Sequence, residues 1–177
     1  MTALDQRRLV FLDESGAKTN MTRLYGRAEV GRRVRGSTPT SNWSTTTMVA
    51  ALGARGADAP FVLEGAMDGD SFGVYVERVL APVVRPGDIV VMDNLSSHKN
   101  KKARALLEKA GACVKDLPPY SPDFNPIEKM WSKIKAALRK VEARTYKGLV
   151  KAVGNALGAV TQEDIRGWFL SCGYDIS

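Results

Sequence analysis

The feature that most constrains the fold is an unbroken apolar run between two aspartates, DIVVMDN at residues 88–94. A strand that is apolar on both faces must be buried on both, as parallel strands are inside helix-covered sheets. Short apolar runs precede this one, and runs with helical spacing alternate with short runs after it. The order predicts an α/β fold, a mixed sheet flanked by helices.

The expected elements follow from the apolar spacing and from the turn residues between the runs. The segment RLYGRAEVGRRVRG at residues 23–36 is either a further strand or a basic loop. The chain contains no internal repeat, low-complexity segment or linker, so we expect one domain over residues 1–177. The predicted strands are 7–16, 45–56, 60–70, 88–94 and 112–117, and the predicted helices are 70–84 and 99–111, with two or three more to the end.

Charge and composition narrow the possible partners and sites. The 177 residues carry 26 bases against 19 acids, a net charge of +7, which favours a polyanionic partner. The 2 cysteines lie far apart, and with only 1 histidine the chain cannot build a multi-histidine zinc site. No apolar run approaches the length of a membrane span, and the start lacks the apolar core of a secretory signal. We therefore expect a cytoplasmic protein without a membrane partner.

Two aspartates follow apolar runs directly, Asp13 after LVFL and Asp93 after IVVM. In open α/β sheets, sites form where strands end, so each position would hold a carboxylate that is rigid and open to solvent. Asp is also common as a plain turn or cap residue. Taken singly, either aspartate could have only that structural role.

A third acid, Glu128, lies at the end of a proline-rich turn, PPYSPDFNPIE at residues 118–128. Asn125 suits the N-cap and Pro126 the first helical position, so Glu128 falls at the third. That is also the glutamate position of a capping box, which leaves a purely structural role open. Lys135 and Arg139 continue the helix edge that Glu128 begins, either as a phosphate-facing row or as a solvated basic face.

Three stretches together resemble a known family. LVFLDESG, VVMDNLSSHK and LPPYSPDFNPIEKMWSKIK are similar to the signature blocks of the DDE transposases of bacterial insertion sequences related to the mariner superfamily. The spacing also agrees, with 34 residues (94–127) between the second and third acids. The resemblance implies a ribonuclease H-like fold in which Asp13, Asp93 and Glu128 are the catalytic, metal-binding triad. Asn94 and His98 match the second block as supporting residues.

The family's chemistry implies Mg²⁺ or Mn²⁺, with two ions that clamp the attacking and leaving oxygens of a displacement at phosphorus. The expected function is cleavage of transposon ends and strand transfer into target DNA. Alternatives are a metal-dependent nuclease of the same fold without strand transfer, or a decayed derivative that only binds DNA. Candidate DNA contacts are Arg32, Arg33, Arg35, Lys133, Lys135 and Arg139, with Lys99, Lys101 and Lys102 as further bases.

The resemblance also carries expectations about assembly. Family members usually place helix-turn-helix DNA-binding modules before the catalytic domain, whereas here the first predicted strand begins at residue 7. We therefore expect double-stranded DNA to be read by a helix-turn-helix segment from an upstream reading frame; the alternative is that the chain is a truncated catalytic half. The active form should be a homodimer that acts on the bacterial nucleoid.

A serine hydrolase is an alternative function from another enzyme class. GDSFG at residues 69–73 fits the nucleophile-elbow pattern G-x-S-x-G. Asp93 and His98 also follow Ser71 in the chain order found in serine hydrolases. The five-residue pattern is weak, and the preceding stretch breaks at Gly65 instead of running as a strand into the turn. Asp70 and Ser71 fit a helix start better. The hydrolase is therefore the less favoured interpretation.

Overall fold

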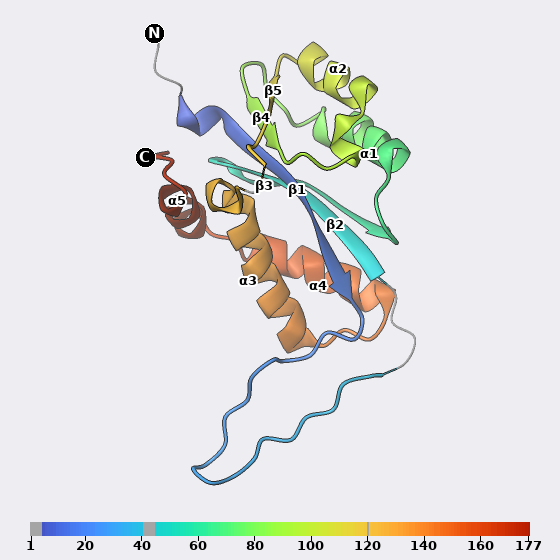
Figure 1. Ribbon diagram of the computed structural model, residues 1–177, viewed down its shortest axis with the longest axis vertical. Helices are drawn as coiled ribbons and strands as arrows, with labels where there is room; N and C mark the ends of the chain where they lie inside the picture. Colours follow the sequence, from blue (N-terminus) through green and yellow to red (C-terminus); the bar gives the residue numbers. More distant parts are fainter. Residues whose placement is uncertain (1–4, 41–44, 120) are drawn as a thin grey trace.

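A five-stranded mixed sheet forms the centre of the molecule, as predicted. The computed structural model describes residues 5–40, 45–119 and 121–177 (Figure 1). The strand order is β3-β2-β1-β4-β5, with antiparallel pairing from β1 through β2 to β3 and parallel pairing from β1 through β4 to β5. The strands are β1 (Leu9–Lys18), β2 (Thr45–Gly53), β3 (Gly56–Glu64), β4 (Ile89–Met92) and β5 (Cys113–Asp116).

Helices cover both faces of this sheet (Figure 1). One face packs against α3, α4 and α5, and the other against α1 and α2. None of the helices in the described ranges is long and apolar enough to cross a membrane. The helices are α1 (Gly69–Tyr75), which continues into a π-helical turn at Val76–Leu80, α2 (Lys101–Lys109), α3 (Pro126–Val141), α4 (Tyr146–Gly158) and α5 (Gln162–Ser171).

Strand β1 separates the two cores, because successive side chains of a strand point to opposite faces. Leu9 and Phe11 belong to the core beneath α3, α4 and α5, whereas Val10 and Leu12 belong to the core beneath α1 and α2. The same alternation sends the next two residues, Asp13 and Glu14, to different faces. This division decides which site each acid can join.

Helix α3 has the apolar stripe that its sequence predicts. Because residues three and four apart lie on the same face of a helix, these apolar side chains form one continuous surface that packs on the sheet. Its members are all buried, and they pack with β1 and with helices α4 and α5. The stripe consists of Ile127, Met130, Trp131, Ile134 and Leu138.

Some boundaries differ from the prediction. Strand β3 begins at Gly56 instead of residue 60, since the short turn at Ala54 and Arg55 folds the chain straight back along β2. Helix α1 begins at Gly69, and Asp68 caps it in a capping box with Ser71. Asp70, expected at the helix start, therefore lies inside the first turn.

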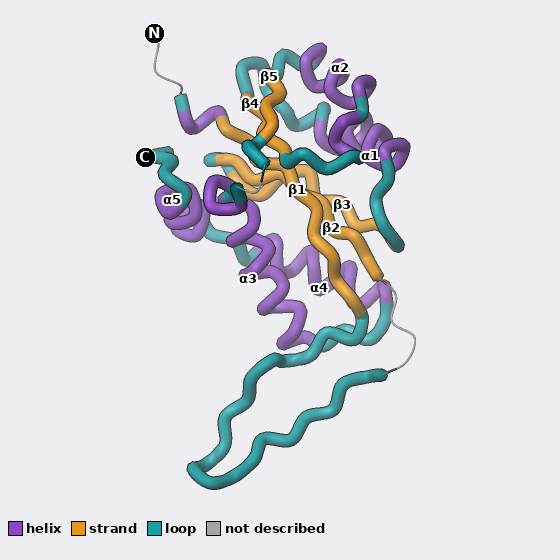
Figure 2. Tube along the Cα trace, in the orientation of Figure 1, coloured by secondary structure: helices purple, strands orange, loops and turns teal. Residues whose placement is uncertain are grey.

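Residues 23–36 form an exposed loop and not a strand. Figure 2 shows the loop, in teal, extending away from the sheet after β1. The segment has no apolar face that could pack on the sheet, and Tyr25 and Val30 stand exposed in it. Of the two possibilities open from the sequence, the basic loop is the one observed.

Candidate active site

The sheet places Asp13 beside Asp93. Asp93 directly follows the end of β4, but Asp13 is not at a strand end open to solvent as expected, because β1 continues through it to Lys18 along β2. Strands β1 and β4 are parallel neighbours, and Leu12 pairs with Met92. The residue after each partner is one of the two aspartates, so the two carboxylates leave adjacent strands at the same level. Asp13 is buried, with only 5% of its surface exposed, whereas Asp93 is half-buried.

Glu128 reaches the same place from helix α3. The proline-rich turn passes through a short 3-10 helix at Pro122–Phe124, and α3 then begins with Asn125 at the N-cap and Pro126 at the first position. Glu128 lies in the first turn and is exposed. Glu128 and Asp93 line one cleft of about 490 Å³, together with residues that include Leu117, Pro118 and Pro119.

The alternative role of Glu128 as a helix cap does not match the contacts. Helices α1 and α5 both begin with a reciprocal capping box. Helix α3 has no side-chain cap, and the backbone N–H of Glu128 donates to the backbone carbonyl of Asn125 at 3.2 Å. The Glu128 carboxylate is therefore not used to terminate its own helix.

The three carboxylates interact electrostatically. Burial raises the pKa of Asp13 to about 7, and the negative charges of Glu128 and Asp93 add to the increase. Both acids must therefore lie close enough to Asp13 for their charges to be felt in a poorly solvated environment. A divalent cation among them would remove this repulsion, since it favours the ionised form of each carboxylate.

The donors present suit a hard divalent cation. Asn125 adds an amide to the cleft; it is 5% exposed, and its Oδ1 has no hydrogen-bond partner among the described residues. A buried acceptor without a donor costs about 1–3 kcal/mol, so this oxygen is suited to a ligand or bound water. Carboxylate and amide oxygens are the ligands that Mg²⁺ and Mn²⁺ prefer.

The acids are not preassembled around one point. Within residues 5–40, 45–119 and 121–177, no three acidic, histidine or cysteine side chains are gathered tightly enough to hold a metal ion. Uncompensated carboxylates repel one another, and such repulsion favours an open arrangement. Asp93 and Glu128 line the cleft, and a bound cation would offset the repulsion between the acids.

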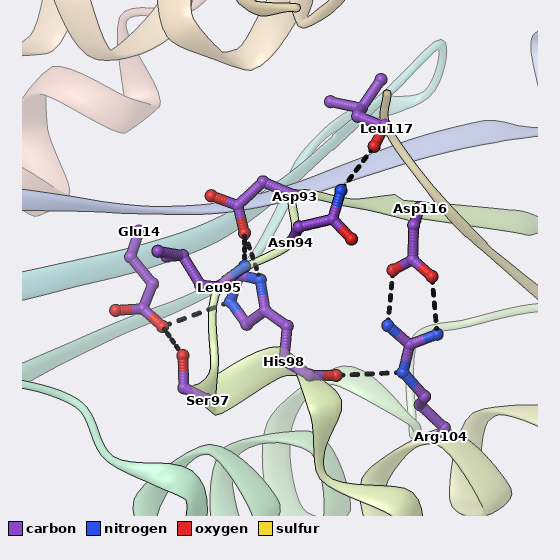
Figure 3. A network of polar contacts seen from close by, with 9 residues as sticks. All are labelled: Glu14, Asp93, Asn94, Leu95, Ser97, His98, Arg104, Asp116 and Leu117. Carbon is purple, nitrogen blue, oxygen red and sulfur yellow. Dashed lines mark hydrogen bonds and ion pairs between the residues drawn. The ribbon is translucent and has the colours of Figure 1, made fainter. Parts of the chain in front are cut away.

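The two expected supporting residues lie beside Asp93 (Figure 3). The Asn94 side-chain amide donates to the backbone carbonyl of Leu117 at 2.8 Å, which joins the ends of β4 and β5. His98 is fully buried, and its Nδ1 lies 2.7 Å from Oδ1 of Asp93. Its Nε2 lies 3.2 Å from Oε1 of Glu14.

The charge of His98 is stabilised by these contacts. Burial alone would lower the pKa of the imidazole, but hydrogen bonding to Asp93 and Glu14 outweighs burial and raises the pKa to about 9. Glu14 was not singled out from the sequence. The alternation of β1 could have indicated that it faces away from Asp13, but its partner is distant in the chain.

The predicted basic contacts fall into two groups. Arg32, Arg33 and Arg35 are exposed on the loop after β1. Lys135 and Arg139 are half-buried on α3, and Arg139 shares a hollow of about 620 Å³ with Arg23 at the base of that loop. Arg23 was not among the candidates, because only folding places it beside α3.

Lys133 differs from the other bases of α3. Its ammonium forms an ion pair with Asp164 and donates to the backbone carbonyl of Ala159 at 3.3 Å. The packing of α3 against α5 therefore gives this lysine a partner within the protein. Lys99, Lys101 and Lys102 are exposed near the start of α2.

The hydrolase pattern does not form a hydrolase site. Residues 69–73 lie inside helix α1, and β3 already ends at Glu64, so no strand runs into a sharp turn at Ser71. The Ser71 hydroxyl donates to Asp68 Oδ1 at 2.6 Å within the capping box. His98 instead places its two ring nitrogens against Asp93 and Glu14.

Several solved structures of Mos1 transposase have a similar fold. A pre-cleavage Mos1 transpososome matches with a TM-score of 0.75 and 18% identity over 96% of this chain and 54% of that chain. The Mos1 mariner paired-end complex with Mn matches with a TM-score of 0.72 and 19% identity, over 94% of this chain and 52% of that chain. The catalytic domain of Mos1 mariner transposase matches with a TM-score of 0.68 and 18% identity, over 94% of this chain and 78% of that chain. The chain thus has the ribonuclease H-like fold and spans about half the length of the transposase chains in those complexes.

The sequence itself identifies the family. A comparison with curated proteins gave no match. The profile of the family described as DDE superfamily endonuclease matches residues 8–150, which include Asp13, Asp93 and Glu128. Because this match covers most of the chain, the protein belongs to the DDE superfamily endonucleases.

Proposed function

We propose that the chain is the catalytic domain of a transposase from a bacterial insertion sequence related to the mariner superfamily, which cleaves transposon ends and joins them to target DNA. The observation that carries the proposal is that Asp93, after β4, and Glu128, in the first turn of α3, line one cleft, and that the charges of both act on Asp13 in the adjacent strand β1. Asp13, Asp93 and Glu128 are the proposed catalytic triad.

The same acids would hold Mg²⁺ or Mn²⁺, two ions in the productive complex, and Mos1 structures are described with Mg and with Mn. Such ions activate the attacking oxygen and stabilise the leaving oxygen of an in-line displacement at phosphorus. Asp13, Asp93 and Glu128 would be the carboxylate ligands, and Asp13 is the most buried of the three. The reaction needs no nucleophilic side chain, so one site serves cleavage and joining.

Bound DNA would follow the basic residues of the loop after β1 and of α3. The loop carrying Arg32, Arg33 and Arg35 and the α3 edge carrying Lys135 and Arg139 offer positive charge beyond the cleft. Lys133 is a weaker candidate, because binding DNA would cost it the ion pair with Asp164. Phosphate contacts of this kind give affinity without sequence preference.

Sequence-specific recognition would come from elsewhere. We propose that a helix-turn-helix segment encoded upstream reads the transposon end, and that the active form is a homodimer on nucleoid DNA in the bacterial cytoplasm. The Mos1 neighbours include a transpososome and paired-end complexes, which is the support for a DNA-bound assembly. The single domain over residues 1–177 would be the catalytic part.

The test uses the chain joined to its recognition segment, a duplex carrying the transposon end, and a target plasmid. With Mg²⁺ or Mn²⁺ we expect nicking at the end and then joining of the 3′-hydroxyl to the plasmid, both abolished by Asp93→Asn and by a chelator. Cleavage without joining would identify a nuclease of the same fold. Binding without cleavage would identify a decayed derivative.

A further inference from the structure

Two adjacent acids on β1 have separate surroundings. Asp13 shares the environment of Glu128 on the α3 side, as its raised pKa shows. Glu14 is turned the other way, toward the core that contains Phe72. There the Ser97 hydroxyl donates to Oε1 of Glu14 at 3.2 Å, and His98 Nε2 lies 3.2 Å from the same oxygen. Glu14 is therefore directed beneath the cleft and not into it.

His98 connects Glu14 to Asp93. The imidazole has no exposed surface, and its ring lies 4.7 Å from that of Phe72. Each ring nitrogen faces one carboxylate, Asp93 at 2.7 Å and Glu14 at 3.2 Å (Figure 3). Burying a polar ring in an apolar core costs free energy unless its nitrogens are paired. The two acids therefore fix the ring in one orientation.

The ring in turn fixes Asp93. Oδ1 of Asp93 receives the backbone N–H of Leu95 at 3.0 Å and also faces His98 Nδ1. Figure 3 shows the second carboxylate oxygen of Asp93 turned away from the imidazole. With one oxygen held from below, only the other is available on the cleft side. Asp93 is thus prepared to bind a cation through a single oxygen.

We propose that Glu14 and His98 are positioning residues, a bridge beneath the cleft that holds Asp93 in the orientation for cation binding. The proposal rests on the proposed function, since it concerns the same cation site. Partners that orient metal ligands through hydrogen bonds commonly change metal affinity or activity about 10- to 100-fold when they are removed. Glu14 acts at the far end of the bridge and would touch neither DNA nor cation.

The variants separate positioning from simple stability. Glu14→Ala removes the far end of the bridge at a position where 14% of the side chain is exposed, so the chain should still fold. Glu14→Gln restores an oxygen that can accept from His98 and Ser97. Asp116→Asn is the matched control, because it weakens the neighbouring ion pair with Arg104, whose Nε donates to the His98 carbonyl, without touching the bridge.

Two measurements on the isolated chain test the bridge. The first is Mn²⁺ affinity by calorimetry, with thermal unfolding recorded on the same samples. The second is ¹⁵N NMR of histidine-labelled protein, in which the single histidine of the chain gives one imidazole spectrum. Wild type should show two slowly exchanging ring N–H protons, because the ring is buried and each nitrogen lies within 3.2 Å of a carboxylate oxygen.

The expected result is that Glu14→Ala stays folded, loses the Nε2–H signal and binds Mn²⁺ about 10- to 100-fold more weakly. Glu14→Gln should recover part of the Nε2–H signal and part of the Mn²⁺ affinity, and Asp116→Asn should match wild type in both. Loss of the ring signal with wild-type Mn²⁺ affinity would overturn the positioning role, and so would unprotected ring protons in wild type. If wild type and Asp116→Asn both failed to bind Mn²⁺, the proposed function itself would fail.

Discussion

Leu12 of β1 pairs with Met92 of β4 in a parallel register, and the residue after each is a proposed catalytic carboxylate. A one-residue slip would turn one aspartate to the opposite face of the sheet. The site thus depends on the register of two buried strands.

Asp13→Asn should abolish nicking by the chain joined to its recognition segment. The substitution keeps the shape of the buried side chain but removes a proposed carboxylate ligand of the cation. We expect a rate loss of at least about 100-fold, equivalent to nearly 3 kcal/mol of barrier. The measurement is the single-turnover rate at saturating Mn²⁺, with exposed Asp58→Asn as the matched control. A residual rate close to wild type would remove Asp13 from the triad.

Glu128→Gln and Glu128→Ala should both leave the metal-free protein almost unchanged in stability. Glu128 is exposed, and α3 has no side-chain cap for either substitution to break. We expect free energies of unfolding within about 0.5 kcal/mol of wild type, measured by urea denaturation. If alanine costs a full kcal/mol or more while glutamine does not, the capping-box role is the correct one.

The basic loop should contribute to DNA binding through phosphates alone. Replacing Arg32, Arg33 and Arg35 with alanine should reduce the slope of log affinity against log salt by about 0.9 for each phosphate that is no longer neutralised. The measurement is a salt titration of binding to two unrelated duplexes. A control of equal charge change, Lys109, Lys147 and Lys151 to alanine, should leave the slope nearer to wild type. Equal slopes for the two triple variants would show that the loop has no special role.

Acid should weaken the fold partly through Asp88. Burial opposes ionisation of this side chain, but hydrogen bonds from Arg55 at 3.0 and 2.7 Å and from the Arg85 N–H outweigh it, so its pKa lies below 3.8. A lowered pKa contributes stability above the unfolded value that is lost as pH falls through the folded value.

Asp88→Asn should therefore cost about 1–3 kcal/mol at pH 7, discounted from a fully buried pair because Arg55 is partly exposed. Its deficit relative to wild type should shrink as pH falls below 4. Thermal unfolding between pH 3 and 7 measures both, with Asp58→Asn as control. A deficit that stayed constant down to pH 3 would contradict the role of Asp88.

The sequence predicted those parts of the fold and site that depend on local pattern. Both aspartates stood out because an acid after an apolar run suggests a strand end. This was right for Asp93 and wrong for Asp13, since β1 continues to Lys18. The stripe of α3 followed from helical spacing. Glu128 needed the resemblance as well, because its position alone also fits a capping box.

Long-range contacts were beyond such patterns. The role of Glu14 depends on its contact with His98, which is distant in the sequence. Only the folded position of the segment after β4 brings His98 beside β1. Lys133 was grouped with its helix neighbours, but tertiary packing against α5 pairs it with Asp164. Residues 23–36 gave no periodic signal, so strand and loop could not be separated.

The central claim is that three carboxylates form one cation site, and Mn²⁺-dependent thermal stabilisation tests it most directly. A cation that binds only the folded state adds about 2.7 kcal/mol at a hundredfold excess over Kd. Wild type should show this shift, and Asp13→Asn, Asp93→Asn and Glu128→Gln should each lose most of it while remaining folded without metal. If any one of the three variants kept the full wild-type shift, that residue would not belong to the site.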